Sequence, residues 1–333
     1  MTMANDTSMR RVLITDDVHP VMLQLFRSAG IEAVQQCVAD AGRLLALVAD
    51  YDGLVVRSKV AIDAAFVDRC GSRLRCIGRL GAGMDAIDVA YAEAHGIRCL
   101  NSPEGNRDAV GEHTVALLLA LFDKVARADA QVRRGLWLRE DNRGLELQGR
   151  TVGIIGFGNM GGAFARRLAG FDCRVLAYDL LGPAASGFGL ALPYVEDASL
   201  DQLRDQAEVL SLHVPLTAST RHLVDASFLA AFRHDLFLVN TSRGAVVSTA
   251  DLAAALLSGK VRGAALDVME YENMANDGLA LSSLPAPWRH LVQSDRTVLT
   301  PHVAGWTVES KYKLAAVLAR KMAAVLLPDA VPQ

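Results

Sequence analysis

Three short stretches in the second half of the chain carry side chains suited to acid–base and anion-binding chemistry. "TPHVAGWT" places His302 directly after an apolar run, and "NTSRG" ends another such run at Arg243. "LDVMEYE" ends a third run in the acids Asp267, Glu270 and Glu272. An imidazole titrates near neutral pH, and a guanidinium grips carboxylate or carbonyl oxygens. Each residue alone is more often a satisfied core histidine or a solvated surface charge, so a catalytic site is predicted only if they converge.

A glycine motif earlier in the chain predicts a bound dinucleotide. In "TVGIIGFGNMG", Gly156, Gly158 and Gly161 follow an apolar strand pattern and precede a helical one. The first glycine allows a tight turn, the second lets the backbone approach a pyrophosphate, and the third lets helix and strand pack closely. The free N–H groups at the helix start favour phosphate. Asp179, at the end of the next apolar run, should bind the ribose hydroxyls and repel a 2′-phosphate, which favours NAD over NADP.

The elements that must position these residues form two alternating strand–helix series. A chain of 333 residues suggests two domains. Nearly continuous apolar runs predict buried parallel strands; they lie at 12–17, 53–58, 74–81 and 97–103, and then at 151–156, 173–179, 209–216, 236–244, 263–270 and 297–304. This alternation predicts an α/β fold of two doubly wound parallel-sheet domains.

Three other segments complete the expected organisation. Residues 106–134 have a helical pattern, interrupted only by Gly111, that predicts one long helix bridging the domains. Residues 308–327 predict a terminal helix, and Pro328 follows them. Residues 271–296 are expected to form a long loop of the kind that borders sites in such folds.

Composition excludes several function classes. The net charge of −3 gives no reason to expect nucleic acid or a membrane as a partner. The longest apolar run, 114–122, is too short to span a bilayer, and the first residues lack a signal-peptide pattern. The five cysteines, with no CxxC pattern, predict reduced thiols and a cytoplasmic protein. The eight histidines show no metal-ligand spacing, so no metal site is expected.

Taken together, the motifs resemble the D-2-hydroxyacid dehydrogenase family. "GIIGFGNMG", "AYD", "HVPLTAST", "NTSRG", "ALDVMEYE" and "TPHVAGWT" stand in that family's order and spacing, and "LVVRS", "RLGAGMDAID" and "NSPEGNRDAVGEH" are similar to its other half. The similarity covers roughly residues 10–325. It is closest to the bacterial D-3-phosphoglycerate dehydrogenase branch without a regulatory domain, to which "WLREDNRGLEL" is similar.

The resemblance implies a division of the chain into two domains. Residues 1–103 with 305–333 would form a flavodoxin-like substrate domain, and residues 104–304 a Rossmann NAD-binding domain. Closure of the two domains would exclude water from the site. The family also dimerises through its cofactor domain, so a homodimer is expected.

The resemblance further implies three catalytic residues. His302 would take the proton from the substrate's 2-hydroxyl as hydride leaves C2, and would return it in the reverse reaction. Glu272 would hydrogen-bond the other imidazole nitrogen, fixing the tautomer and favouring the charged form. It is chosen over Glu270 because the family places this acid five residues after the aspartate, here Asp267. Arg243 would bind the substrate carboxylate and polarise the 2-keto oxygen.

Binding residues are also carried over from the family. The implied cofactor contacts, beyond the three glycines and Asp179, are Asn159, Met160, His213, Val214, Pro215, Thr220, Thr241, Ser242, Asp267 and Gly305. The implied substrate contacts are Arg57, Ser58, Gly81, Ala82 and Gly83. The chain departs from many relatives at Lys59–Val60, where a threonine follows "RSx", and at Ala82, where some relatives carry threonine.

The substrate is the least determined feature. Five cations could meet a phosphate: Arg57, Lys59, Arg79, Arg139 and Arg143. They favour oxidation of D-3-phosphoglycerate to 3-phosphohydroxypyruvate, the first step of serine synthesis. The alternative is a reductase of glyoxylate, hydroxypyruvate or another small 2-keto acid, and a reading from another class is a non-catalytic NAD-sensing protein. Formate dehydrogenase is disfavoured because its histidine is paired with glutamine, not with an acid.

Overall fold

The computed structural model describes residues 9–182, 192–272 and 285–328. The chain divides into two compact units, each built on a parallel sheet. Unit 1 comprises residues 1–106 and 306–333, and unit 2 comprises residues 107–305. The predicted fold class, two doubly wound α/β domains, is confirmed. The boundaries expected from the sequence, at 103/104 and 304/305, lie within three residues of the junctions between the units.

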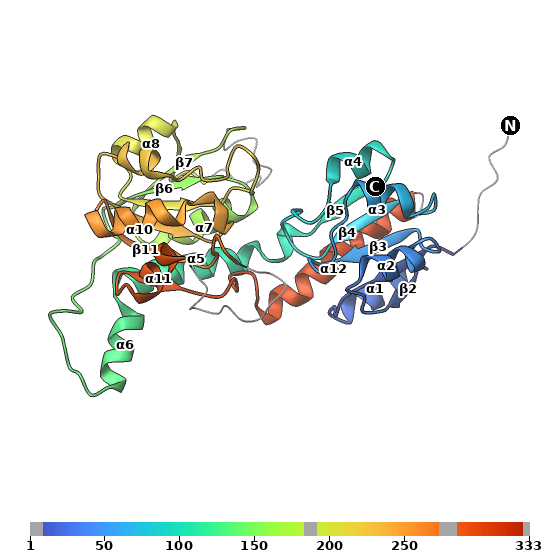
Figure 1. Ribbon diagram of the computed structural model, residues 1–333, viewed down its shortest axis with the longest axis horizontal. Helices are drawn as coiled ribbons and strands as arrows, with labels where there is room; N and C mark the ends of the chain where they lie inside the picture. Colours follow the sequence, from blue (N-terminus) through green and yellow to red (C-terminus); the bar gives the residue numbers. More distant parts are fainter. Residues whose placement is uncertain (1–8, 183–191, 273–284, 329–333) are drawn as a thin grey trace. The chain divides into compact units, whose positions relative to one another are not determined.

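Unit 1 contains a five-stranded parallel sheet of order β2-β1-β3-β4-β5 (Figure 1). Its elements are β1 Arg11–Ile14, α1 Val21–Ser28, β2 Glu32–Gln35, α2 Ala41–Val48, β3 Gly53–Val56, α3 Ala64–Arg69, β4 Cys76–Arg79, α4 Val89–Ala94, β5 Arg98–Asn101, the short 3₁₀ helix η1 Pro103–Gly105, and α12 Val308–Leu326. This is the flavodoxin-like strand order, in which the direction of winding reverses between β1 and β3.

Alternation along the strands of unit 1 assigns side chains to two separate cores. Val12 and Ile14 pack with α1 and α12, whereas Leu13 between them packs with α2 and α3. All three side chains are fully buried. Successive side chains of a strand point to opposite faces, so a sheet covered on both sides needs the continuous apolar runs seen in the sequence.

Unit 2 contains a seven-stranded parallel sheet of order β12-β11-β10-β9-β6-β7-β8. Its elements are α5 Arg107–Phe122, α6 Val125–Arg133, β6 Thr151–Ile155, α7 Asn159–Arg167, the 3₁₀ helix η2 Leu168–Gly170, β7 Arg174–Tyr178, β8 Val195–Asp197, α8 Leu200–Gln206, β9 Val209–Leu212, α9 Ala226–Ala230, β10 Leu236–Asn240, the 3₁₀ helix η4 Gly244–Val246, α10 Thr249–Ser258, β11 Val261–Leu266, α11 Ala286–Gln293 and β12 Thr297–Leu299. Helices α5 and α7 pack on one face, and α8 to α11 on the other.

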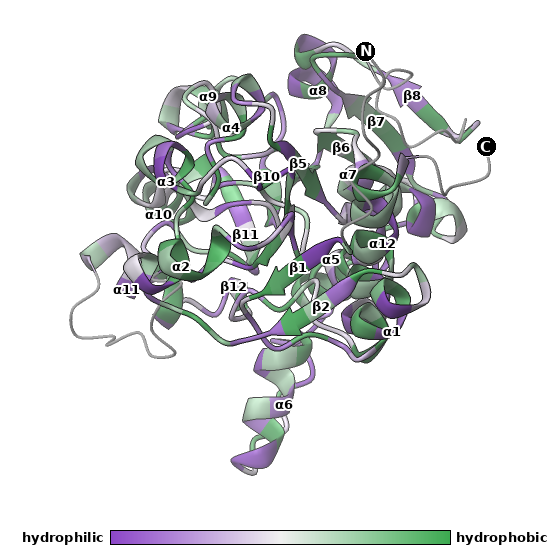
Figure 2. Ribbon diagram, turned by 90° about the vertical axis from the view of Figure 1, so that its right-hand side faces the viewer, coloured by the Kyte–Doolittle hydropathy of each residue, from purple (hydrophilic) through white to green (hydrophobic). Residues whose placement is uncertain are grey.

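The single helix predicted over 106–134 is wrong, because the chain breaks it into α5 and α6. Lys124 adopts a left-handed conformation with φ of 53°, which ends α-helical hydrogen bonding. The carbonyl of Phe122, which a continuing helix would use, instead accepts a hydrogen bond from the returning backbone N–H of Leu145 at 3.2 Å. Helix α6 has no buried residue and projects from unit 2 in both views (Figures 1 and 2).

Other expectations for the fold also need correction. The segment 271–296, expected to be a loop, contains α11, which buries Trp288 and Leu291 against α10 and β12; residues 273–284 lie outside the described residues. The predicted strand 297–304 is shorter, since β12 covers only 297–299. Strands β2 and β8, largely exposed edge strands, carried too little apolar pattern to be anticipated. Across the described ranges, no helix is long and apolar enough to cross a membrane.

Candidate active site

The glycine motif of unit 2 lies where the winding of its sheet reverses, between β6 and β9. Ligands of open α/β sheets bind outside the carboxyl ends of the strands at this point. Gly156 follows β6 with φ of 88°, in the left-handed region that favours glycine. A Cβ on Gly156 would lie 2.7 Å from the carbonyl oxygen of His213, which follows β9. A side chain at this position would therefore force the ends of the two central strands apart.

The next two glycines fit the predicted pyrophosphate cradle. A Cβ on Gly161 would lie 2.0 Å from the carbonyl oxygen of Gly156, so only glycine lets α7 start this close to the β6 turn. A Cβ on Gly158 would meet no atom within 4 Å, so the backbone there borders open space. Helix α7 begins at Asn159 with no side-chain cap at its N-terminus. These features leave room and backbone donors for phosphate groups at the position predicted for the pyrophosphate.

Asp179 lies beside this turn and ties it to the end of β7. Its Oδ2 accepts a hydrogen bond from the backbone N–H of Phe157 at 2.8 Å, and its Oδ1 accepts one from that of Leu181 at 3.0 Å. A carboxylate oxygen has further acceptor capacity, so both oxygens can still receive ribose hydroxyls. The next two residues, Leu180 and Leu181, are exposed and apolar and offer no cation to a 2′-phosphate. The surroundings of Asp179 therefore fit NAD.

The "HVP" turn meets the glycine loop through its backbone rather than through the histidine ring. The imidazole of His213 packs against Phe164, with ring centroids 5.5 Å apart; its Nε2 lies 2.8 Å from Ser211 Oγ, and its buried Nδ1 meets no hydrogen-bond partner among the described residues. Burial lowers the pKa of His213 from 6.5 to about 3. The ring therefore stays neutral, and the atoms that lie nearest to a Cβ on Gly156 are the His213 carbonyl and the Val214 side chain.

The three predicted catalytic residues all follow neighbouring strands of the same sheet. The registers pair Asn240 of β10 with Leu266 of β11, and Leu266 with Leu299 of β12. Arg243 comes three residues after the first of these, and His302 three residues after the last. Carboxyl ends of adjacent parallel strands share one edge of a sheet, so sequence positions about 60 residues apart are brought to one place.

His302 is hydrogen-bonded to Glu272 through its Nδ1 atom. The two side chains are partly exposed, 34% for the histidine and 22% for the glutamate. The His302 backbone is held in the left-handed region, with φ of 53°, and its N–H donates to the carbonyl oxygen of Asp267 at 2.7 Å. No hydrogen bond joins Nε2 to any described residue. The ring thus has one nitrogen anchored by an acid and the other open to a reacting group.

Asp267 organises the loop that carries His302. Its carboxylate accepts hydrogen bonds from the backbone N–H groups of Val303 and Ala304, at 2.9 and 2.8 Å, and from the Thr300 hydroxyl at 2.5 Å. His113 of α5 lies 3.4 Å from the same carboxylate. Burial raises the pKa of Asp267, but these hydrogen bonds more than compensate and hold it below its ordinary value. Both oxygens are therefore bonded within the protein, and the cofactor contact that the family resemblance implies at Asp267 stays a prediction.

Glu270, which sequence analysis rejected in favour of Glu272 as the partner of His302, has a structural role that the sequence did not reveal. Its Oε1 lies 2.6 Å from Nε2 of His222, and its Oε2 accepts the backbone N–H of Thr249, the first residue of α10, at 2.9 Å. Burial raises the pKa of Glu270, but these hydrogen bonds outweigh it and leave the pKa lowered. Glu270 thereby ties the loop carrying Glu272 to α10. Only the fold brings His222 within reach, so no local pattern could have revealed this.

Arg243 lies on the loop that faces this glutamate. A Cβ on the next residue, Gly244, would lie 1.9 Å from the carbonyl carbon of Met269, so the backbones of the two loops are in direct contact. The Arg243 carbonyl accepts the Asn240 side-chain amide at 3.0 Å, and its Nη1 donates to the Ser242 carbonyl at 2.7 Å. Arg243 is partly buried. The loop geometry therefore keeps the guanidinium close to the backbone of its own turn.

The remaining predicted cofactor residues lie on turns at the same edge. The Thr241 hydroxyl is 3.1 Å from that of Thr114 on α5, and the Ser242 hydroxyl donates to Asn240 Oδ1 at 2.8 Å. The Thr220 hydroxyl donates to the carbonyl of Pro215 at 2.6 Å and closes the loop after β9. Of the rest, Met160 is the second residue of α7, and Gly305 is the last residue of unit 2.

The predicted substrate residues lie in unit 1, again at a reversal of winding. Arg57 and Ser58 directly follow β3, next to the end of β1. The Arg57 guanidinium lies over the Trp306 ring, 5.7 Å from its centroid, and its buried Nε has no hydrogen-bond partner in the described part of the chain. Gly81 has φ of 145°, and a Cβ there would lie 1.4 Å from Nη1 of Arg79. The contact with the Trp306 ring thus positions Arg57, and its Nε–H remains available to a ligand.

Ion pairs within the chain engage Lys59 and Arg143, which the sequence offered as cations for a phosphate. Lys59 Nζ lies 3.0 Å from Oδ1 of Asp16, a residue that is 3% exposed, and the hydrogen bond to Asp16 raises the pKa of Lys59. Arg143 pairs with Glu140 at 2.7 Å. No local pattern in the sequence signalled the Lys59 pairing, because Asp16 lies 43 positions before its partner.

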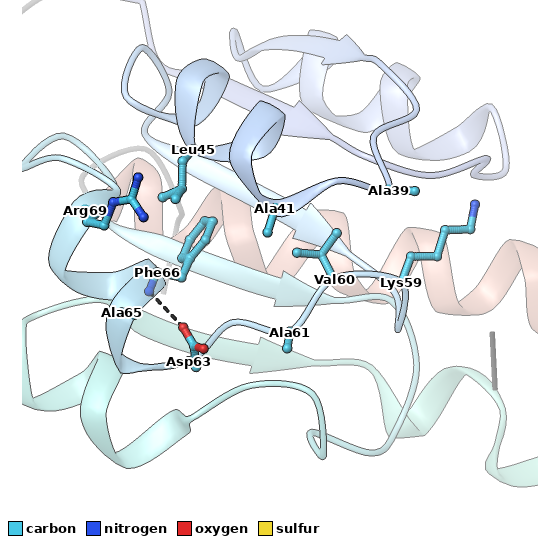
Figure 3. Close-up of a pocket in the computed structure, with 10 residues that line it drawn as sticks. All are labelled: Ala39, Ala41, Leu45, Lys59, Val60, Ala61, Asp63, Ala65, Phe66 and Arg69. Atoms are coloured by element: carbon cyan, nitrogen blue, oxygen red, sulfur yellow. Dashed lines mark hydrogen bonds between the residues drawn. The ribbon is translucent and has the colours of Figure 1, made fainter. Parts of the chain in front are cut away.

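An open pocket of about 330 Å³ lies on the same unit, next to the predicted substrate residues (Figure 3). Figure 3 shows Lys59 at one end and Arg69 at the other, with the apolar side chains of Val60, Phe66 and Leu45 between them. None of the five predicted substrate residues lines this pocket. The pocket therefore does not coincide with the predicted substrate site.

Comparison with known proteins identifies the family. Residues 115–304 match the profile of the NAD-binding domain of the D-isomer-specific 2-hydroxyacid dehydrogenases. The chain belongs to this family. It is an NAD-dependent oxidoreductase of D-2-hydroxy acids, and the predicted family, activity and cofactor are confirmed.

Three relatives illustrate the range within the family. A hydroxypyruvate reductase of Thermotoga maritima is 34% identical over 94% of this chain and 97% of its own length. A D-3-phosphoglycerate dehydrogenase of Archaeoglobus fulgidus is 33% identical over 93% of this chain, which spans 56% of that enzyme. The crystal structure of a protein from Thermus thermophilus is 32% identical with a TM-score of 0.77, covering 96% of this chain and 97% of its own.

Proposed function

We propose that this dehydrogenase interconverts D-3-phosphoglycerate and 3-phosphohydroxypyruvate, with His302, Glu272 and Arg243 as its catalytic residues. The observation that carries the catalytic assignment is the hydrogen bond between His302 and Glu272, which leaves the other imidazole nitrogen open. The phosphorylated substrate is supported by Arg57 and Arg79 at the strand ends of unit 1 and by the phosphoglycerate dehydrogenases among the relatives. In this role the enzyme would serve serine biosynthesis.

The chemistry that NAD supplies when bound is acceptance of the hydride from C2 of the substrate. His302 would accept the 2-hydroxyl proton on Nε2 as this occurs, and would return it in the reverse direction. Glu272, bound at Nδ1, would keep that atom protonated and stabilise the imidazolium as it forms. Arg243 would hold the carboxylate and polarise the 2-keto oxygen. The glycine turn, Asp179 and the "HVP" backbone would hold the dinucleotide.

On unit 1, Arg57, Ser58 and the backbone of residues 81–83 would bind the acidic end of the substrate. Arg57 is already placed by Trp306 and has an unsatisfied donor, as a preorganised anion ligand should. Ala82 offers only backbone groups, and its carbonyl already accepts the side-chain amide of Asn101 at 2.6 Å.

A homodimer through unit 2 is part of the proposal. Helix α6 and the following loop expose the large apolar side chains Val125, Val132, Leu136, Trp137 and Leu138, with Trp137 at 77%. A contiguous exposed apolar segment of this kind marks an interaction surface. Sedimentation analysis of wild type and of Trp137→Glu tests this, with a dimer expected for wild type and a larger monomer fraction for the variant.

We also propose a cytoplasmic location, since all five cysteines are free thiols.

His302→Ala tests the catalytic assignment. Turnover should fall by at least about 10³-fold, because the acid–base group is removed, while NADH affinity should stay within about twofold because the glycine turn is untouched. His234→Ala, which removes an exposed histidine, is the control. Equal turnover of His302→Ala and wild type would refute the assignment, and an NADH-binding protein inactive on every 2-keto acid would favour the sensing role.

A reductase of unphosphorylated 2-keto acids is the second candidate. It is favoured by the pairing of Lys59 with Asp16, which removes one cation from those available to a phosphate. A steady-state panel of phosphohydroxypyruvate, hydroxypyruvate and glyoxylate with NADH and with NADPH distinguishes the two. Equal or better kcat/KM with the unphosphorylated acids would overturn the phosphoglycerate assignment.

A further inference from the structure

A buried carboxylate stands at the carboxyl edge of unit 1 in the middle of the proposed anion site. Asp16 follows β1, and its side chain is 4% exposed. We propose that Asp16 determines substrate specificity by neutralising Lys59, so that the site binds substrates with a second anionic group less tightly than Lys59 alone would allow. This inference rests on the proposed placement of the substrate's acidic end at Arg57 and Ser58.

The position of Asp16 is fixed by groups on both sides of the point where the winding reverses. Its Oδ2 accepts the backbone N–H of Arg57 and the hydroxyl of Thr15, each at 3.2 Å, and its Oδ1 is 3.0 Å from the Lys59 ammonium. The carboxylate is therefore tied to the backbone of the residue proposed to bind substrate. It cannot move away when another anion approaches.

A ligand can recruit Lys59 only by displacing Asp16 from its ammonium. The Lys59 side chain is 56% exposed, so only its ammonium end is held, and Figure 3 shows that end pointing away from Val60 and Phe66. Lysine presents a point charge on a flexible stem that can exchange one oxygen partner for another. A phosphate entering beside Arg57 would have to compete with Asp16 for this ammonium.

The charges around this edge give the direction of the effect. Arg57 and Lys59 are cations, whereas Asp16 and Asp17 are anions, and Asp17 pairs with Lys311 of α12 at 2.9 Å. A monoanionic 2-keto acid needs one guanidinium for its carboxylate. A phosphorylated acid carries up to two further negative charges. Asp16 repels these charges, and Lys59, which could bind them, is already paired with Asp16. Removing the Asp16 charge should therefore favour phosphorylated over unphosphorylated substrates, whichever wild type prefers.

Asp16→Asn tests this, because the amide oxygen can still accept from Arg57. The ratio of kcat/KM for phosphohydroxypyruvate to that for hydroxypyruvate should rise about two- to fivefold, the range expected for one partly exposed charge pair. The change should lie mainly in KM and shrink at high salt. Asp17→Asn is the matched control, with the same charge change at an exposed neighbour, and it should alter the ratio less than twofold.

The double variant Asp16→Asn/Lys59→Met should return the ratio to within about twofold of wild type. An unchanged ratio in Asp16→Asn, or an equal change in Asp17→Asn, would overturn the inference. A measurement without turnover separates it from the proposed function. Inorganic phosphate should raise the Tm of Asp16→Asn more than that of wild type or of the double variant. If none of the 2-keto acids is reduced, the proposed function fails, and equal phosphate shifts in all three proteins would then refute the role of Asp16.

Discussion

The buried imidazole of His213 should make the stability of the enzyme depend on pH in a defined window. Because burial lowers its pKa from 6.5 to about 3, the folded protein keeps the ring neutral while the unfolded chain takes up a proton below pH 6.5. The unfolded state then binds more protons than the folded state, so this contribution is complete above about pH 6.5 and is lost as the pH falls towards 3.

The magnitude follows from the separation of the two pKa values. Each pH unit within this window costs about 1.4 kcal/mol of unfolding free energy. Lowering the pH from 7.5 to 5.0 crosses about 1.5 units of it, so His213 should remove about 2 kcal/mol of stability. A loss of this size is a large fraction of the 5–15 kcal/mol typical of a native protein.

Urea unfolding at pH 7.5 and 5.0 tests this with wild type and His213→Gln. The glutamine does not titrate, and its amide can still hydrogen-bond the Ser211 hydroxyl. Wild type should lose about 2 kcal/mol more than the variant on acidification. His234→Gln, which removes an exposed imidazole, should follow wild type. If wild type and His213→Gln lose stability in parallel, to within about 0.5 kcal/mol, the assigned burial effect is wrong.

Three further predictions concern the same unit. Gly161→Ala should weaken NADH binding at least tenfold and destabilise the protein by about 1–3 kcal/mol, because its Cβ would overlap the Gly156 carbonyl. Gly170→Ala is the control, since a Cβ there meets nothing within 4 Å, and it should change neither property. Fluorescence titration measures the affinity, and urea unfolding measures the stability. Glu270→Gln should lower kcat more than NADH affinity and destabilise by about 1 kcal/mol, because the His222 pair is lost; unchanged kcat would contradict this. NADH at about 100 Kd should stabilise the protein by about 2.7 kcal/mol and raise Tm in calorimetry, and an unshifted Tm would argue against the glycine turn as its site.

Much of the fold could be predicted because its strongest signals are local. The continuous apolar runs of the central strands indicate burial on both faces of the sheet. The glycine spacing at 156–161 indicates a close turn. Both signals can be read from a few consecutive residues. The break at Lys124 could not be predicted this way, because the residue that competes for the Phe122 carbonyl is Leu145, more than 20 positions away. Helix α11 was missed for a related reason, since its apolar residues Trp288 and Leu291 gain a partner only when α10 and β12 pack against them.

The sequence by itself determined which chemistry is present: a dinucleotide turn, an acid after its second strand, and an imidazole, an acid and a guanidinium at the ends of apolar runs. These are properties of residue type and spacing, which local sterics and hydrogen-bonding capacity control. Only the tertiary structure decided how charges pair over long distances. It paired Lys59 with Asp16, used the Asp267 carboxylate to hold the His302 loop, and packed the His213 ring against Phe164. Such pairings depend on which strands the fold makes adjacent, and electrostatic energies follow distance in space rather than distance along the chain.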